Sequence, residues 1–526
     1  MKTNKYLFFI LAFCYISASY GQNLPLPQLV QRIENSVFTV FATDQNGNVF
    51  SQGSGFFINS NGVSITNFHV LEGAQGGFVE KKNGERLEIT RIIDYDVNSD
   101  LVKFQIDSRG RQFTALPLSM TIPQRGEDIV NLSTPLGLEQ TLSTGIVSSV
   151  RECGLFGTVI QITAPISSGS SGSPILNRDG EVLGVATFGV EGGQNLNFAV
   201  STLNFHRIGG SQNIALRDIG RDPLETPNIR QARQAFLIGD YETVFHFAMA
   251  EYQENPENHI ALFLLGRVLY VMEDFANTIE ALTRAIHLAP QIAQNYSVLA
   301  ITLGRLGSIE YHNRNFANAQ EYFSYALQVY EMALSLENHY LCHTNKAILL
   351  WRLVMNYETL NIDRFALDIA TEHLNTAIRL NPYNELAFIV RSSIRRDLGN
   401  YWGAISDIER AIVINPFNSL SFRTRGIIKG LFLNDHRAGI KDLNIALSLA
   451  ERDDDRADIL VTKGFQSFSW FFSIVTANDI ERNVDLLSTL LTDMQRFYRE
   501  AYIISGDRKH LESLESLLET ARSVLR

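Results

Sequence analysis

Ser171 lies in a setting that could support nucleophilic catalysis. It lies in the stretch 167–174, which reads Ser-Ser-Gly-Ser-Ser-Gly-Ser-Pro and stands between two apolar segments of strand character. A serine hydroxyl is a weak nucleophile and needs an adjacent base to accept its proton. Composition alone is more typical of a surface loop, so a nucleophilic role for Ser171 depends on partners elsewhere in the chain.

Two such partners lie upstream of Ser171. His69 is the only histidine between residues 1 and 205, and a neutral imidazole suits a general base because its pKa lies near working pH. Asp100 directly precedes the alternating segment 101–106, where a carboxylate can be buried and can orient the imidazole. Each residue alone is more often structural, and the three together favour catalysis.

Short β-strands are the elements that must position these residues. Alternating or apolar runs are separated by Gly, Asn, Asp and Pro turns, without helices between them. This pattern predicts an all-β barrel or sandwich. The expected strands include 36–41, 53–58, 87–93, 101–106, 128–132, 145–150, 159–162, 182–188 and 196–200.

Over residues 35–202 the chain resembles a trypsin-like protease domain of the HtrA/Deg type, which has a chymotrypsin-like double β-barrel. The order His, Asp, Ser agrees with that of chymotrypsin-like enzymes. Six segments in the family's order carry the resemblance: 53–56 (Gly-Ser-Gly-Phe), 66–70 (Thr-Asn-Phe-His-Val), 99–102 (Ser-Asp-Leu-Val), 144–148 (Thr-Gly-Ile-Val-Ser), 169–174 (Gly-Ser-Ser-Gly-Ser-Pro) and 197–200 (Asn-Phe-Ala-Val).

The resemblance implies a role for each residue of the set. Ser171 would be the nucleophile, His69 the general base and Asp100 the group that orients His69. The amides of Gly169 and Ser171 would form the oxyanion hole. The chain departs from the family pattern at two positions: Ser170 replaces the usual Asn or Asp, and Ser173 replaces a second Gly.

The substrate pocket is less readable from the sequence. In this family the pocket base lies six residues before the nucleophile, which is Pro165 here, followed by Ile166. No carboxylate is present there to pair with a basic substrate residue. Ala186 and Thr187 should form one wall, so we expect a small or medium apolar substrate side chain. No metal-ligand spacing is found, and the resemblance implies no cofactor.

The chain of 526 residues carries a formal net charge of −11 and no basic block, which argues against a nucleic-acid partner. Residues 1–21 read as a signal peptide, with Lys2 and Lys5 before an apolar stretch at 6–16. We therefore expect export to the periplasm or medium of a bacterium, with an uncleaved anchor as the alternative. Cys153 and Cys342 then remain, and both are expected to be buried apolar residues.

Helical repeats follow the β-rich segment. The interval from Pro256 to Pro290 is 34 residues, and so is that from Pro382 to Pro416, with small and aromatic residues at matching offsets. This spacing resembles tetratricopeptide repeats and predicts an all-α solenoid. The interval between the two units exceeds two repeats, which predicts longer helices or insertions around 305–345 and 350–366.

These patterns predict a multidomain protein. The expected parts are a signal peptide (1–21), a protease domain (23–205), a linker (206–228), a tetratricopeptide-repeat domain (229–455) and a helical cap (456–526). The expected function is exported serine endopeptidase activity, with peptide or protein binding in the repeat groove. The alternatives are a catalytically silent or partner-activated protease fold that acts as a scaffold, and a helical array that serves only for spacing or oligomerisation.

Overall fold

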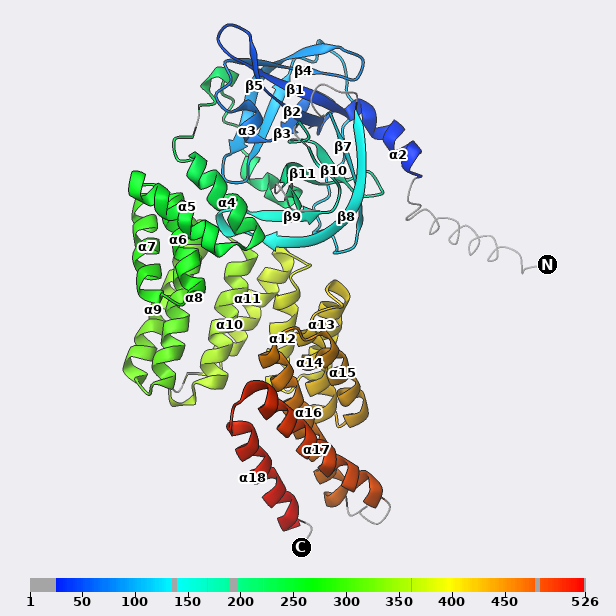
Figure 1. Ribbon diagram of the computed structural model, residues 1–526, viewed down its shortest axis with the longest axis vertical. Helices are drawn as coiled ribbons and strands as arrows, with labels where there is room; N and C mark the ends of the chain where they lie inside the picture. Colours follow the sequence, from blue (N-terminus) through cyan, green and yellow to red (C-terminus); the bar gives the residue numbers. More distant parts are fainter. Residues whose placement is uncertain are drawn as a thin grey trace, which may run out of the picture. The chain divides into compact units, whose positions relative to one another are not determined.

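The computed structural model describes residues 25–134, 140–167, 169–189, 196–220, 222–360, 362–477 and 483–524 (Figure 1). The expected signal peptide lies outside these residues. The chain divides into two compact units, Met1–Gln294 and Asn295–Arg526. We call them the N-terminal unit and the C-terminal unit.

Two closed antiparallel barrels form most of the N-terminal unit. The first has the strand order β1-β2-β3-β6-β5-β4, and the second has the order β10-β11-β12-β9-β8-β7. The double barrel confirms the fold predicted from the sequence. The strands are β1 (Val37–Thr43), β2 (Val49–Phe57), β3 (Val63–Thr66), β4 (Gly76–Glu80), β5 (Arg86–Asp96), β6 (Leu101–Ile106), β7 (Asp128–Ser133), β8 (Thr141–Glu152), β9 (Thr158–Ile162), β10 (Pro174–Leu176), β11 (Val182–Gly189) and β12 (Asn197–Ser201).

Apolar side chains fill each barrel and also the space between them. Alternation along the strands sends every second side chain inward. Phe38, Phe57 and Phe104 are fully buried in the first barrel. A separate cluster joins strands of the two barrels, with Phe56 of the first barrel near Val185 of the second. The barrels are therefore packed on each other, and loops of both meet along the joint.

The segment after β12 packs on the barrels before the first repeat helix begins. Ile214 forms a β-bridge with Ile92 of β5, and Leu216 and Ile219 are buried in the core of the first barrel. Helix α4 (Pro227–Ile238) follows, with the Thr226 hydroxyl accepting from the Ile229 amide at its N-terminus. The linker and domain boundaries drawn from the sequence remain predictions.

Paired helices complete the N-terminal unit. Helices α4 and α5 (Tyr241–Glu254) form one hairpin, and α6 (His259–Val271) and α7 (Phe275–Leu288) form the next. The small residue expected at a helix crossing is Gly266, where an added Cβ would lie 2.8 Å from Leu282. Close packing therefore explains the small residue in the 34-residue pattern.

The C-terminal unit is all-helical within the described residues. Helices α8 and α9 have 20 and 21 residues, so long helices account for much of the excess length between the two clear repeats. The hairpin-and-stack arrangement is compatible with tetratricopeptide repeats. Its helices are α8 (Ala293–His312), α9 (Phe316–Leu336), α10 (Tyr340–Asn356), α11 (Ala366–Leu380), α12 (Glu385–Asp397), α13 (Tyr401–Ile414), α14 (Ser419–Ile427), α15 (His436–Leu449), α16 (Asp453–Thr476), α17 (Val484–Ser505) and α18 (Lys509–Val524).

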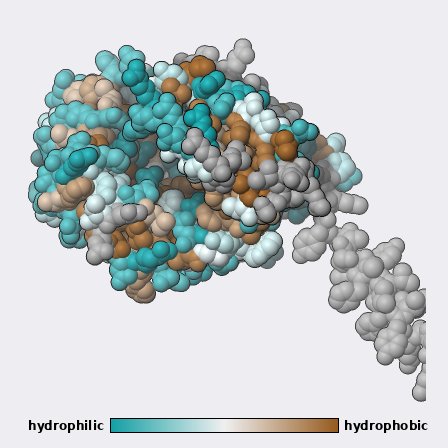
Figure 2. All heavy atoms as spheres, turned by 90° about the horizontal axis from the view of Figure 1, so that it is seen from below, coloured by the Kyte–Doolittle hydropathy of each residue, from teal (hydrophilic) through white to brown (hydrophobic). Residues whose placement is uncertain are grey.

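The helices show no bilayer-spanning segment in the part of the chain that the structure describes. None of them combines the required length with sufficient apolarity. On the face shown in Figure 2, brown apolar residues are interspersed among teal hydrophilic ones.

Candidate active site

His69 lies just beyond the end of a strand of the first barrel. The sequence pattern places it at a strand end, but β3 stops at Thr66 and His69 belongs to the one-turn helix α3 (Phe68–Leu71). Two hydrogen bonds tie this turn to Asp100: the Asn67 side-chain amide donates to the Asp100 carbonyl at 2.9 Å, and the Phe68 N–H donates to it at 3.2 Å. The backbone therefore brings His69 and Asp100 together before their side chains interact.

Both carboxylate oxygens of Asp100 face His69. Oδ1 accepts from the His69 backbone N–H at 3.0 Å, and Oδ2 accepts from the His69 Nδ1–H at 2.8 Å. The Thr187 hydroxyl also donates to Oδ2, at 2.8 Å. Asp100 has a φ of +53°, a left-handed conformation that Asp adopts more readily than most residues. With Nδ1 occupied as a donor, Nε2 is left as the basic nitrogen of the neutral ring.

The electrostatic setting favours an ionised Asp100 and a more basic His69. Burial would lower the pKa of His69, but the neighbouring Asp100 carboxylate outweighs that effect and raises the pKa above its ordinary value. Burial would raise the pKa of Asp100, but His69 and the Thr187 hydroxyl hold it below its ordinary value. The pair can therefore accept a proton on His69 while Asp100 stays charged.

Ser171 is placed on the second barrel, between β9 and β10. Its carbonyl accepts from the Ser54 N–H of β2 at 2.7 Å, and its hydroxyl donates to the Thr187 carbonyl at 3.0 Å. The described contacts include no hydrogen bond from the Ser171 hydroxyl to His69. Thr187 therefore contacts both Asp100 and Ser171. A rotation of the Ser171 side chain is needed before His69 can accept its proton.

Two glycines shape the backbone around Ser171. Gly169 and Gly172 have φ values of +89° and +88°, which favour glycine over any other residue. A Cβ on Gly172 would also overlap the carbonyl oxygen of Ser54. The amide N–H groups of Gly169 and Ser171 take part in none of the hydrogen bonds found among the described residues. They are therefore available to a developing oxyanion.

Ser54 is a site residue for which the sequence motifs predicted no role. Its hydroxyl donates to the Gly169 carbonyl at 2.8 Å and accepts from the Thr134 N–H at 3.1 Å. It is fully buried. The only signal for it in the sequence is its place in the Gly-Ser-Gly-Phe segment that resembles the family. Ser54 connects the first barrel to the loop that carries Ser171.

The two departures from the family pattern are accommodated by buried hydrogen bonds. The Ser173 hydroxyl donates to Asn131 Oδ1 at 2.7 Å, and Ser173 is fully buried. The Ser170 hydroxyl donates to the Ser133 hydroxyl at 3.3 Å and accepts from the Ser167 N–H at 3.2 Å. Both serines therefore anchor the loop to β7 and do not crowd Ser171.

The residues expected in the substrate pocket differ from one another in burial and in hydrogen bonding. Pro165 is exposed, and its carbonyl accepts from the Ser143 hydroxyl at 2.9 Å. Ile166 is half-buried against the core of the second barrel. Ala186 is fully buried, and its carbonyl accepts from the Gly172 N–H at 2.8 Å. Their roles toward a substrate remain predictions.

Comparison with known proteins agrees with this geometry. Residues 53–185 match the family model described as a trypsin-like peptidase domain. The chain carries a trypsin-like peptidase domain. This match spans β2 to β11 and includes His69, Asp100 and Ser171.

The peptidase domain is similar to HtrA-type serine proteases. Serine protease HTRA4 of Mus musculus is 37% identical over 159 residues, covering 28% of this chain and 32% of that protein. Serine protease HTRA3 of Homo sapiens is 37% identical over 164 residues, covering 28% and 35%. The chain thus spans about a third of the length of these relatives. The crystal structure of the serine endoprotease from Yersinia pestis aligns at 26% identity with a TM-score of 0.32, covering 35% of this chain and 65% of that one.

Neither a reactive cysteine nor a metal site is supported in the part of the chain that the structure describes. Cys153 and Cys342 are free and buried, as expected, and burial raises the pKa of each thiol to about 12. Neither is therefore a reactive thiolate at neutral pH. Among the described residues, no group of three or more His, Cys, Asp or Glu side chains could hold a metal ion.

Proposed function

We propose that this protein is an exported serine endopeptidase that hydrolyses protein substrates through Ser171, His69 and Asp100. The observation that carries the proposal is the His69–Asp100 pair, with its Nδ1–Oδ2 distance of 2.8 Å, together with a serine loop in which the amides of Gly169 and Ser171 have no hydrogen-bond partner among the described residues. The similarity to HtrA-type proteases supports it. The expected signal peptide is the basis for export.

Acylation begins when the Ser171 hydroxyl leaves the Thr187 carbonyl and turns toward His69. His69 Nε2 accepts the hydroxyl proton as Oγ bonds to the substrate carbonyl carbon, and Asp100 stabilises the imidazolium. The oxyanion accepts hydrogen bonds from the amides of Gly169 and Ser171. The C–N bond then breaks, and His69 gives its proton to the leaving amine.

Deacylation repeats these steps with water. His69 accepts a proton from water as the oxygen bonds to the acyl carbon, and the oxyanion again occupies the two amides. The bond to Ser171 Oγ breaks and Oγ regains the proton from His69. The products are the two peptide fragments and the unchanged enzyme.

Labelling with a fluorophosphonate probe tests this proposal. The unaltered protein should be labelled on Ser171 and should cleave an unfolded protein. Ser171→Ala should abolish both, whereas Ser167→Ala, in the same loop, should retain both. A protein that takes no label and leaves unfolded substrates intact would contradict the proposal.

A partner-activated protease is the second candidate function. The observation that favours it is the Ser171 hydroxyl, which donates to the Thr187 carbonyl and not to His69. In this version the helical repeats bind a peptide or protein, and binding releases Ser171. Activity that rises with an added partner would favour it. Full activity of the purified chain alone would exclude it and leave the repeats a role in substrate recruitment or assembly.

A further inference from the structure

A cavity of about 260 Å³ lies directly beside His69 and Asp100 in the N-terminal unit. Its walls come from both barrels and from helix α4. The barrels contribute apolar side chains, including Phe68, Val97 and Phe188, beside the polar side chains of the proposed site. Helix α4 contributes Gln234 and Leu237 together with two arginines, Arg230 and Arg233. The helix that follows the peptidase domain thus completes a pocket next to the proposed reacting groups.

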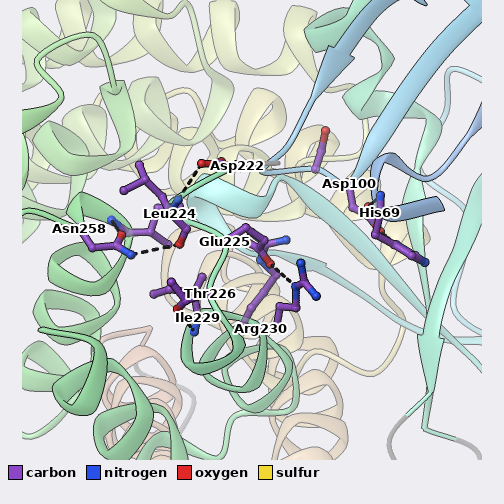
Figure 3. A network of polar contacts seen from close by, with 12 residues as sticks. His69, Asp100, Asp222, Leu224, Glu225, Thr226, Ile229, Arg230 and Asn258 are labelled. Atoms are coloured by element: carbon purple, nitrogen blue, oxygen red, sulfur yellow. Dashed lines mark hydrogen bonds and ion pairs between the residues drawn. The ribbon is translucent and has the colours of Figure 1, made fainter. Parts of the chain in front are cut away.

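Ion pairs hold α4 against this pocket. Arg230 of α4 pairs with Glu72 at 3.0 Å, and Glu72 directly follows the α3 turn that carries His69. Arg233 pairs with Glu225 at 2.5 Å, and Arg230 approaches Glu225 at 3.8 Å. Figure 3 shows Glu225 and Arg230 near the His69–Asp100 pair. The Arg230–Glu72 pair joins α4 to the turn that carries the general base, and the pairs with Glu225 fix the segment that enters α4.

The charges around the pocket are largely compensated. The side chains of Arg233 and Glu225 are only 13% and 8% exposed. The Arg233 guanidinium also lies over the Phe156 ring, 4.6 Å from its centroid. Burial raises the pKa of Glu225 to about 7, although Arg233 opposes this shift. A ligand in this pocket would therefore meet mostly apolar surface and already paired charges.

The volume sets the size of the occupant. Pockets for drug-sized ligands have roughly 300–1,000 Å³, and this cavity is smaller. It suits one or two side chains of a peptide. An apolar side chain would be favoured because it gains burial without leaving a polar group unpaired.

We propose that this pocket is a specificity site for a large apolar side chain of the protein substrate, and that α4 determines which side chains fit. The inference rests on the proposed peptidase function and adds the substrate class. Gln234 is its specificity-determining residue, since it lines the pocket from α4 and is neither charged nor part of the ion pairs. The helical segment thereby takes part in choosing the cleavage site.

Variants at Gln234 test this proposal in the full-length chain. Gln234→Phe should fill the pocket. Cleavage next to large apolar substrate residues should then fall by roughly tenfold or more relative to cleavage next to a substrate alanine, a size of effect common for apolar pockets. Gln234→Ala should enlarge the pocket and shift the preference toward Trp. The matched controls are Gln231→Phe and Gln231→Ala, because Gln231 is exposed on the same helix and does not line the pocket. Mass-spectrometric mapping of cleavage sites in an unfolded protein gives the preference.

A binding measurement separates this inference from the proposed function. Fluorescence anisotropy with labelled Gly/Ser heptapeptides carrying a central Phe, Leu, Ala, Asp or Lys needs no catalysis and is done on Ser171→Ala protein. The Phe and Leu peptides should bind best, and adding Gln234→Phe should abolish that advantage. Equal binding of all five peptides, or an unchanged preference in Gln234→Phe, would overturn the inference even if the peptidase is active. Selective binding by Ser171→Ala protein, together with no cleavage by the unaltered protein, would support the pocket and contradict the proposed function.

Discussion

Among single residues, Thr187 is the one whose hydrogen bonds connect the proposed nucleophile to the proposed orienting carboxylate. Thr187 donates its hydroxyl to Asp100 and accepts the Ser171 hydroxyl on its carbonyl, at 2.8 and 3.0 Å. His69 Nδ1 meets the other side of the same carboxylate oxygen. Thr187 was expected only as a pocket wall, and its contacts give it a positioning role as well. The charge on Asp100 also raises the pKa of His69 and so affects its protonation state.

The first prediction concerns pH. Since Asp100 raises the pKa of His69, and the base must be neutral, kcat/KM should rise with pH through a pKa above the ordinary value of about 6.5. Asp100→Asn should lower that pKa and reduce kcat by several orders of magnitude, because the amide no longer holds the Nδ1–H tautomer or stabilises the imidazolium. Profiles of kcat/KM against pH for both proteins check this. An apparent pKa that is unchanged in Asp100→Asn would contradict it.

The second prediction concerns Ser54. Ser54→Ala removes the hydrogen bond to the Gly169 carbonyl and leaves that peptide less restrained beside the proposed oxyanion hole. Small misplacements of such groups can cost on the order of a hundredfold in rate. We expect kcat to fall by about tenfold to a hundredfold with KM little changed. Thermal unfolding under the same conditions provides the control, and a proportional loss of folded protein would argue for a purely structural role.

At the scale of elements, the helices add interactions of their own. In the C-terminal unit, α10 and α11 face each other through His343 and His373, whose Nδ1 atoms are 2.7 Å apart. His343 Nε2 lies 2.7 Å from Asn338 Oδ1. The bonds are satisfied if His343 Nε2–H donates to Asn338 and His373 Nδ1–H donates to His343. Protonating His343 at Nδ1 would set two N–H groups against each other.

The third prediction follows from this pair. Burial, with Lys346 and His343 adding to it, lowers the pKa of His373 to about 4, and burial also lowers that of His343. Their neutral forms are favoured in the folded state, so stability should fall as pH drops below about 6.5, the ordinary value for His. The protection of the backbone amides of α10 and α11 in the full chain, after correction for the pH dependence of intrinsic hydrogen exchange, should be lower at pH 5 than at pH 7.5. His373→Gln should reduce this difference, and an equal difference in that variant would exclude the pair as its source.

At the scale of the whole molecule, the two compact units differ in what stabilises them. Closed barrels with long-range strand pairing dominate the N-terminal unit, whereas helix hairpins with short-range contacts form the C-terminal unit. Chains with separate compact units commonly depart from a single cooperative transition. Cys153 belongs to the first unit and Cys342 to the second, and both are buried. Each thiol can therefore report the opening of its own unit.

The fourth prediction uses these thiols. In native buffer neither Cys153 nor Cys342 should react with a thiol reagent, because burial raises both thiol pKa values. Across a urea series, pulsed alkylation read by mass spectrometry should show the two residues becoming labelled at different midpoints. Coincident midpoints would contradict independent unfolding. Rapid labelling without urea would contradict the burial itself.

The amino-acid sequence alone was enough to predict a candidate chemistry and an order of parts. A single histidine before residue 205, an Asp at a strand entrance and a serine between small residues were enough to predict the triad, and the period of two along the strands predicted a β-fold. The 34-residue spacing predicted paired helices, because small residues at fixed offsets are needed where helices cross. These are local or periodic features, which a linear sequence carries directly.

How these parts meet became visible only in the folded chain. The bond from Ser54 to Gly169 joins residues 115 positions apart, and the ion pair from Arg230 to Glu72 joins residues 158 positions apart. The resting bond of Ser171 to Thr187 and the α4 wall beside His69 likewise depend on how the barrels close and where the next helix packs. Such contacts cannot be predicted from the spacing of residues along the chain, because they arise from three-dimensional packing.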